Sequence, residues 1–97
     1  MQLVDGFYIP DGDLPKHHTA ESVIKHDKIL HDKVLEFTKD RNHMVDVGGN
    51  VGRWSLDFAQ DFKVVSAFEP APYHIECFQQ NCHQYPNIHL FPYGLSN

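Results

Sequence analysis

The sequence lacks the features that place a protein in a membrane or outside the cell. It has no apolar run of membrane-spanning length, and its first residues lack the charged start and apolar stretch of a signal peptide. Only two of its 97 residues are cysteines, Cys77 and Cys82, five positions apart on different faces of one expected helix. They are poorly placed to form a disulfide, which suits a reducing compartment, so we expect a soluble protein of the cytoplasm with no membrane partner.

Positive charge is also scarce. Eight Lys and Arg stand against thirteen Asp and Glu, which leaves a net charge of −5. Before His43 the basic residues are interleaved with more numerous acidic ones, so they indicate a solvated surface and no basic patch. A protein that neutralises nucleic-acid phosphates needs the opposite balance, so we expect no nucleic-acid partner. The apolar content of 41% suits one small domain with a modest core.

The first part of the chain divides into a turn-rich segment, 1–18, and the start of a domain that spans 19–97. In the first segment the stretch YIPDGDLP favours tight turns over a long element. Thr19 is expected to cap an amphipathic helix that ends near Asp40. Its polar side carries His26 and His31, which we expect to face solvent. Its apolar stripe consists of Val23, Leu30, Val34 and Phe37.

The rest of the chain alternates between strands and helices. Strands are predicted over 43–47, 63–68 and 87–91, and the second is nearly continuously apolar, as in a parallel strand covered on both faces. This order, a helix followed by βαβαβ, predicts an α/β fold with a three-stranded parallel sheet in the order 3-2-1. The two intervening helices carry the apolar stripes Val51, Trp54, Phe58 and Phe62, and Ile75, Phe78, Cys82 and Tyr85. Trp54 is accordingly expected to pack in the core.

A glycine turn with an acidic residue at its entrance, VDVGGNVG, follows the first of these strands. It does not fit a dinucleotide fingerprint, whose first glycine would fall on Val47, nor a Walker-type phosphate loop, because no Gly-Lys-Ser or Gly-Lys-Thr follows. Asp46 would repel a pyrophosphate but would stabilise an ammonium or sulfonium group. The turn therefore favours a ligand whose near end is cationic.

A second acidic residue, Glu69, ends the next strand, 17 residues after Gly52. Acidic residues in this place in doubly wound folds meet a ribose. S-adenosylmethionine carries an ammonium and a sulfonium as well as ribose hydroxyls, so the two acids suit its two halves, and we expect it as the cofactor. The alternative is that the turn is only a tight connection and Glu69 a surface carboxylate.

The stretches VDVGGNVGRWSLDFA, VVSAFEPAPYHIECFQQN and NIHLFPYGLSN resemble the cofactor half of the FkbM-type methyltransferases, a branch of the Rossmann-like, S-adenosylmethionine-dependent enzymes. The resemblance covers about residues 40–97, and more loosely the lead-in DGFYIPDGD. It implies methylation of oxygen atoms of sugars or other small molecules. It also implies these cofactor-binding residues: Asp46, Gly48, Gly49, Asn50 and Gly52 at the methionine end, Glu69 at the ribose, and Pro70, Gly94 and Leu95 around the adenine.

Members of that family continue past the third strand with further strands and the loops that hold the acceptor. The 97 residues do not include this part, and because methyl transfer depends on alignment of the acceptor, no catalytic base is assigned. Without a neighbour the strand 43–47 becomes an apolar edge, and natural proteins seldom leave such an edge bare. We expect a second copy of the chain, a separate polypeptide or the N-terminal helix to cover it.

Three functions stay open at this stage. They are a methyltransferase or its cofactor half acting on a small-molecule acceptor, a non-catalytic module that binds the cofactor, and a structural or assembly protein without a ligand. A zinc site is the weaker interpretation of the histidines, because a helix brings together only residues three or four apart. The residues considered for it are His74, Cys77, Cys82 and His83, and we expect no metal.

Overall fold

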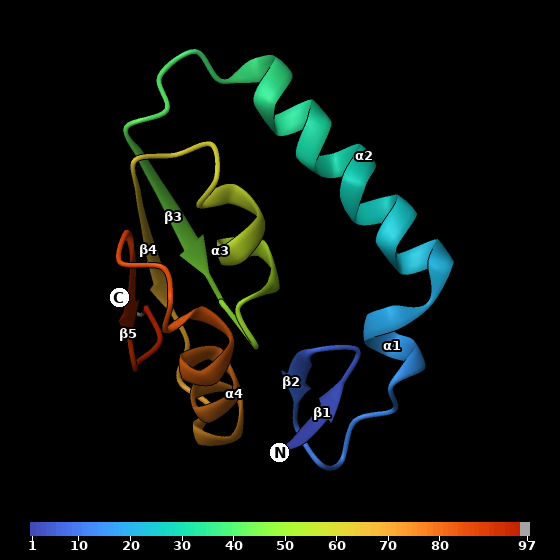
Figure 1. Ribbon diagram of the computed structural model, residues 1–97. Helices are drawn as coiled ribbons and strands as arrows, with labels where there is room; N and C mark the ends of the chain where they lie inside the picture. Colours follow the sequence, from blue (N-terminus) through green and yellow to red (C-terminus); the bar gives the residue numbers. More distant parts are fainter. Residues whose placement is uncertain (96–97) are drawn as a thin grey trace.

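The computed structural model describes residues 1–95, which form an antiparallel hairpin, a parallel sheet and four helices (Figure 1). The elements in chain order are β1 Gln2–Val4, β2 Phe7–Ile9, α1 Lys16–Thr19, α2 Glu21–Phe37, β3 His43–Val47, α3 Arg53–Phe58, β4 Val64–Phe68, α4 Pro72–Cys82 and β5 Ile88–Phe91. Within the described residues, none of the helices has both the length and the apolar character that a membrane span requires.

The parallel sheet has the order β3-β4-β5, with β4 in the centre. Ser66 of β4 is the partner of Val45 on one side and of His89 on the other. The α/β class, the three parallel strands and their order 3-2-1 are therefore as the alternating apolar pattern predicted. Because the strands are parallel, their carboxyl ends meet at one edge of the sheet.

The core lies between this sheet and the two helices α3 and α4. One cluster joins Phe58 and Phe62 to Val65 of β4, and a second joins Ala67 of β4 to two residues of α4. Trp54 packs against the first cluster and stacks on Phe58 with ring centroids 5.6 Å apart, which confirms its expected place in the core.

The opposite face of the sheet is not covered by any helix of the described chain. Buried and half-buried residues alternate along β4, and Val45 and Val47 of β3 are 52% and 64% exposed. The expectation that β4 is covered on both faces is therefore wrong. The reason is topological: β3-α3-β4 and β4-α4-β5 step in the same direction along the sheet, and right-handed crossovers then place both helices on one face.

Helix α2 turns a different side inward than the apolar pattern predicted. Leu30, Val34 and Phe37 are exposed, Phe37 by 80%. The half-buried stripe of α2 contains Asp27, His31 and Leu35 instead. Of the predicted core stripe only Val23 lies on this side, and the expectation that His31 faces solvent is also wrong, because polar contacts with α3 decide the orientation of the helix. The helix runs beside α3 and leaves the face of β3 open (Figure 1).

The start of α2 also differs from the prediction. A short helix, α1, ends at Thr19, and Ala20 occupies the N-cap position of α2 without a side-chain hydrogen bond. The Thr19 hydroxyl donates to the carbonyl oxygen of Pro15 at 2.9 Å, one turn back in α1. Thr19 is therefore the last residue of one helix and not the cap of the next.

The first ten residues form a β-hairpin that the sequence analysis did not anticipate. Its turn consists of Asp5 and Gly6, both with positive φ (51° and 80°), as in the two-residue turns that match the twist of a hairpin. The Asp-Gly dipeptide between QLV and FYI was the available signal. Ile9 at the end of β2 is fully buried, so the hairpin is part of the packed structure.

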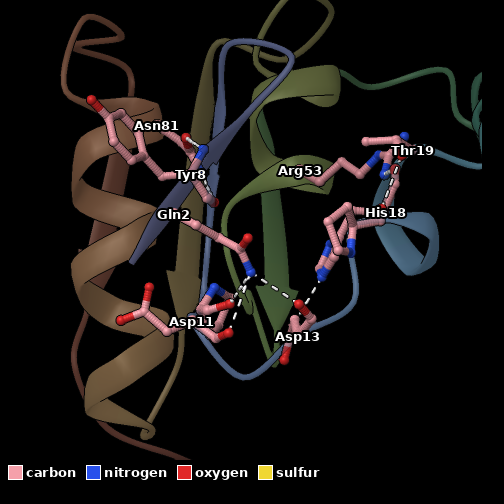
Figure 2. A network of polar contacts seen from close by, with 10 residues as sticks. Gln2, Tyr8, Asp11, Asp13, His18, Thr19, Arg53 and Asn81 are labelled. Carbon is pink, nitrogen blue, oxygen red and sulfur yellow. Dashed lines mark hydrogen bonds and ion pairs between the residues drawn. The ribbon is translucent and has the colours of Figure 1, made fainter.

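Polar contacts tie the N-terminal residues together and to α3 and α4 (Figure 2). The Gln2 amide donates to the carbonyl oxygens of Pro10 and Asp13 at 3.0 and 2.9 Å, and His18 Nε2 lies 2.8 Å from a carboxylate oxygen of Asp13. Arg53, the first residue of α3, donates to the carbonyl oxygen of His18. These contacts place the N-terminal segment against the amino end of α3, directly after the glycine turn.

Candidate functional site

The glycine turn joins the carboxyl end of β3 to α3 through three residues with positive φ. These are Gly48 at 76°, Asn50 at 53° and Gly52 at 93°. A Cβ atom at Gly52 would lie 2.6 Å from Cys82 Sγ, so the missing side chain lets α3 begin directly against α4. At Gly49 a Cβ would meet Phe78 and Ala67 at 3.1 and 3.2 Å, so close packing requires a glycine there too.

The backbone N–H groups of this turn already have partners inside the protein. Gly48 and Gly49 both donate to the carbonyl oxygen of Phe68, at 2.8 and 2.9 Å. Asn50 donates to a carboxylate oxygen of Glu69 at 2.7 Å, and Gly52 donates to the carbonyl oxygen of Gly49 at 3.0 Å. A phosphate-binding loop instead leaves such groups pointing at its anion. These four N–H groups therefore do not form an anion site.

Asp46 lies at the entrance of the turn, on the side of β3 that faces the helices. Its carboxylate accepts a hydrogen bond of 2.8 Å from the Ser55 hydroxyl on α3. Burial raises the pKa of Asp46 above its usual value, and the charge of Glu69 acts in the same direction, although the hydrogen bond from Ser55 opposes both. A cation placed beside Asp46 would relieve this unfavourable charge.

Glu69 follows β4 and is only 5% exposed. Its Oε1 accepts from the N–H of Asn50, and its Oε2 accepts from the N–H of Ala71 at 2.9 Å and contacts His74 Nδ1 at 3.3 Å. Burial would raise the pKa of Glu69, but these hydrogen bonds and the nearby His74 outweigh it and hold the pKa below the usual range. Glu69 thus fastens the glycine turn to the start of α4. It is not a free surface carboxylate.

The two acids belong to adjacent strand ends, because Val47 of β3 pairs with Phe68 of β4. Asp46 precedes this pair and Glu69 follows it, and the charge of Glu69 reaches Asp46 strongly enough to shift its pKa. The structure therefore brings together Asp46, Glu69 and the glycine turn, as the spacing in the sequence suggested.

The residues expected around an adenine lie after β4 and β5. Gly94 comes close to the ring of Pro70, since a Cβ at Gly94 would lie 3.6 Å from Pro70 Cγ. Leu95 is exposed. The sequence analysis missed a group of aromatic side chains here: Phe68 and Phe91 stack at 4.9 Å, and Tyr93 meets Phe68 edge-on at 5.8 Å.

The residues considered for zinc have other roles. His74 contacts Glu69, and Cys77 and Cys82 are both buried and free of disulfides. Burial and the charge of Asp46 raise the pKa of Cys82 to about 12, so this thiol stays protonated at neutral pH. Residues 1–95 contain no group of three or more His, Cys, Asp or Glu side chains placed to hold a metal ion.

Two cavities of the described chain lie outside this site. One of about 530 Å³ is lined by residues of both α2 and α3, and another of about 260 Å³ is lined by residues of the hairpin, α1 and α2. Arg53 lines both, and neither is lined by Asp46 or Glu69. The candidate site is thus a surface at the carboxyl edge of the sheet, where ligands of open α/β sheets bind.

Several solved structures with a similar fold are methyltransferases. An rRNA methylase from Streptococcus thermophilus matches at 24% identity over 68% of this chain and 41% of its own (TM-score 0.60). Precorrin-6y C5,15-methyltransferase from Geobacter metallireducens matches at 18% over 89% and 43% (TM-score 0.64). CalS10, an amino pentose methyltransferase from Micromonospora echinaspora solved with S-adenosylmethionine bound, matches at 24% over 68% and 27% (TM-score 0.53).

These similarities define the class of fold: the chain has the Rossmann-like α/β architecture of S-adenosylmethionine-dependent methyltransferases. It spans less than half the length of the methyltransferases named above. No protein-family model matches the sequence, and no curated protein matches it.

Proposed function

We propose that the chain is the cofactor-binding half of an S-adenosylmethionine-dependent methyltransferase. One observation carries the proposal: two carboxylates meet at adjacent strand ends, beside a glycine turn in which four N–H groups are already paired. Such a surface favours a cationic ligand over a phosphate. The methyltransferase neighbours support the same interpretation through their fold.

Each part of S-adenosylmethionine can be matched to described residues at this edge of the sheet. Asp46 would attract the ammonium and sulfonium groups. Glu69 would receive a ribose hydroxyl at Oε1, which accepts a single hydrogen bond within residues 1–95 and has a lone pair for a second. Pro70 and Gly94 would lie along the adenine. When bound, the cofactor would supply an electrophilic methyl group, and these side chains would bind and orient it.

We further propose an FkbM-type enzyme that methylates an oxygen of a sugar or another small molecule. The sequence resemblance supports this assignment. The rRNA methylase among the structural neighbours raises RNA as the alternative substrate. The net charge of −5 argues against it, because binding to RNA depends on neutralised phosphates. We also propose the cytoplasm as its location, since both cysteines are free.

Thermal shift tests cofactor binding directly. S-adenosylmethionine at about a hundred times its dissociation constant should stabilise the chain by about 2.7 kcal/mol. In a domain of this size, each kcal/mol raises the melting temperature by roughly 4–8 °C. S-adenosylhomocysteine, which keeps the ammonium and the ribose, should also stabilise the chain. ATP should not, because Asp46 would face its phosphates.

Asp46→Asn should reduce the shift with S-adenosylmethionine, and Glu76→Gln, a change at an exposed acid on α4, should leave it unchanged. Because Glu69 also holds the turn, its variant Glu69→Gln must first show an unchanged melting temperature without ligand. A chain that shifts with neither S-adenosylmethionine nor its product, or that shifts with ATP, would contradict the proposal.

A non-catalytic cofactor-binding module is the second candidate. It needs only the surface formed by Asp46, Glu69 and the glycine turn, and no acceptor site. Both candidates predict the thermal shift. Transfer of a radiolabelled methyl group to a panel of sugars and other hydroxylated small molecules distinguishes them, and transfer to RNA would replace the proposed acceptor class.

We also propose that a polypeptide supplying the rest of the sheet covers the free edge of β3. In the described chain β3 has a single strand neighbour, β4. The exposed Val45 and Val47 lie on the open face next to this edge. Parallel sheets are normally covered on both faces, and unpaired edges invite a further strand.

A further inference from the structure

Helix α2 is attached to the domain through polar groups and through Leu35, which packs against the core cluster around Phe58. It has 17 residues, and none of them is buried. A cavity of about 530 Å³ is lined by residues of both α2 and α3. An isolated helix of this length is marginally stable in water, so α2 depends on its contacts with the domain. The contacts between these two helices therefore control whether α2 stays in place.

His31 makes the central contact. Its Nδ1 contacts a carboxylate oxygen of Asp57 on α3, and its Nε2 lies 3.0 Å from a carboxylate oxygen of Asp61, just after α3. The ring also stacks on Phe58, with centroids 4.5 Å apart. A neutral imidazole has one N–H, whereas carboxylates only accept. Two hydrogen bonds to two carboxylates therefore require the imidazolium form, with a proton on each nitrogen.

We propose that His31 is a proton-operated clasp: the imidazolium holds α2 against α3 through Asp57 and Asp61, and loss of its proton releases α2 and opens the cavity between the helices. Release follows because the neutral ring can donate to only one of the two carboxylates. The other carboxylate would then face a ring nitrogen that carries a lone pair.

The other charged groups around the clasp do not replace it. On α2, Asp27 pairs with Arg53 of α3 at 3.4 Å and lies 3.6 Å from His26, and Lys28 pairs with Asp32 at 3.5 Å on the exposed side. The pair between Asp27 and Arg53 lies one turn toward the amino end of α2 and makes no contact with the two carboxylates that hold His31.

The direction of the pH effect follows from the surroundings of His31. Burial lowers its pKa, but the hydrogen bonds and charges of Asp57 and Asp61 outweigh burial and raise the pKa above the usual value of about 6.5. A raised folded-state pKa means that the contribution to stability is complete below about pH 6.5 and is lost as the pH rises through the folded-state value.

Hydrogen exchange of residues 21–37 tests the clasp between about pH 6 and pH 9, a range that begins near the unperturbed histidine value. After correction for the intrinsic pH dependence of exchange, protection of α2 should fall by up to tenfold per pH unit between about pH 6.5 and the His31 midpoint in the folded chain, the limit for release of one proton, and should level off above that midpoint. Residues 64–68 should keep their protection, because β4 does not contact His31.

Three variants and one titration complete the test. His31→Gln should make α2 protection low and independent of pH, whereas His26→Gln on the exposed side of α2 should behave like the wild type. Asp61→Asn should move the loss of protection to lower pH. Protection of α2 that does not change with pH in the wild type, or an NMR titration of His31 with a midpoint at or below about 6.5, would overturn the proposal.

Discussion

Single residues of the turn after β3 have separable roles. Gly48 and Gly52 both have positive φ, but a Cβ at Gly48 would meet no atom within 4 Å, whereas a Cβ at Gly52 would collide with Cys82. Gly48 is thus required by the backbone alone. Gly52 is required by the backbone and by the packing of α3 against α4.

Alanine substitutions at these glycines should therefore lower the free energy of unfolding by different amounts. Gly48→Ala should lower the free energy of unfolding by about 1–2 kcal/mol, the cost of a left-handed conformation for an L-residue. Gly52→Ala should cost about 1–3 kcal/mol more, because it also overpacks the core. Gly12→Ala, at an open position without positive φ, should change the free energy of unfolding by less than about 0.5 kcal/mol. Urea denaturation measures all three, and equal losses at Gly48 and Gly52 would contradict the packing role.

The sequence revealed the acids of the candidate site but not their partners. Asp46 and Glu69 could be found because each ends an apolar run beside turn residues. Ser55 and His74, which bind these two carboxylates, could not be distinguished from other polar residues on a helix. Their roles depend on which side of α3 and α4 faces the sheet, and this is a tertiary property.

At the scale of elements, Asn81 of α4 holds the hairpin in place. Its amide exchanges hydrogen bonds with both backbone groups of Tyr8, at 2.8 and 2.9 Å, and donates to the carbonyl oxygen of Val51 at 2.8 Å (Figure 2). One side chain thus joins β2, α4 and the glycine turn, although Tyr8 and Asn81 are 73 positions apart.

Asn81→Ala should destabilise the chain by about 1–3 kcal/mol, because it leaves half-buried backbone groups of Tyr8 without partners. Hydrogen exchange of residues 2–9 should increase more than that of β4. The control is Gln80→Ala, on the exposed side of the same helix. An unchanged hairpin in Asn81→Ala would show that burial of Ile9 alone is enough to hold it.

Helix α2 shows why an apolar pattern can mislead for a single element. Its apolar residues are spaced correctly for a helix, and the helix exists close to the predicted range. However, the stripe that includes Asp27 and His31 faces α3, because those residues find charged partners there. Periodicity predicts that an element is helical, but the contacts available on its neighbours decide which side it buries.

At the scale of the whole molecule, the sheet is covered on one face only. Val65 of β4 is completely buried under α3, whereas Val47 of β3 is 64% exposed on the other face. The matched substitutions Val65→Thr and Val47→Thr place the same hydroxyl on opposite faces. The first should cost about 1–3 kcal/mol, as expected for an unsatisfied buried hydroxyl.

Val47→Thr should cost less than about 0.5 kcal/mol in the chain alone. Light scattering should show a monomer, and the amides of residues 43–47 that face the free edge should exchange rapidly. If Val47→Thr costs as much as Val65→Thr, or if the chain forms a dimer that protects 43–47, a second copy covers this face in place of the proposed polypeptide.

The sequence by itself determined the alternation of strands and helices, the parallel sheet and the glycine turn. These features depend on local periodicity, on β-branched runs and on residues that tolerate positive φ, all of which act over a few positions. Only the tertiary structure decided the inward side of α2, the docking of the hairpin through Asn81 and the clasp at His31. Each of these depends on a polar contact between residues far apart in the chain, and such a contact leaves no periodic trace in the sequence.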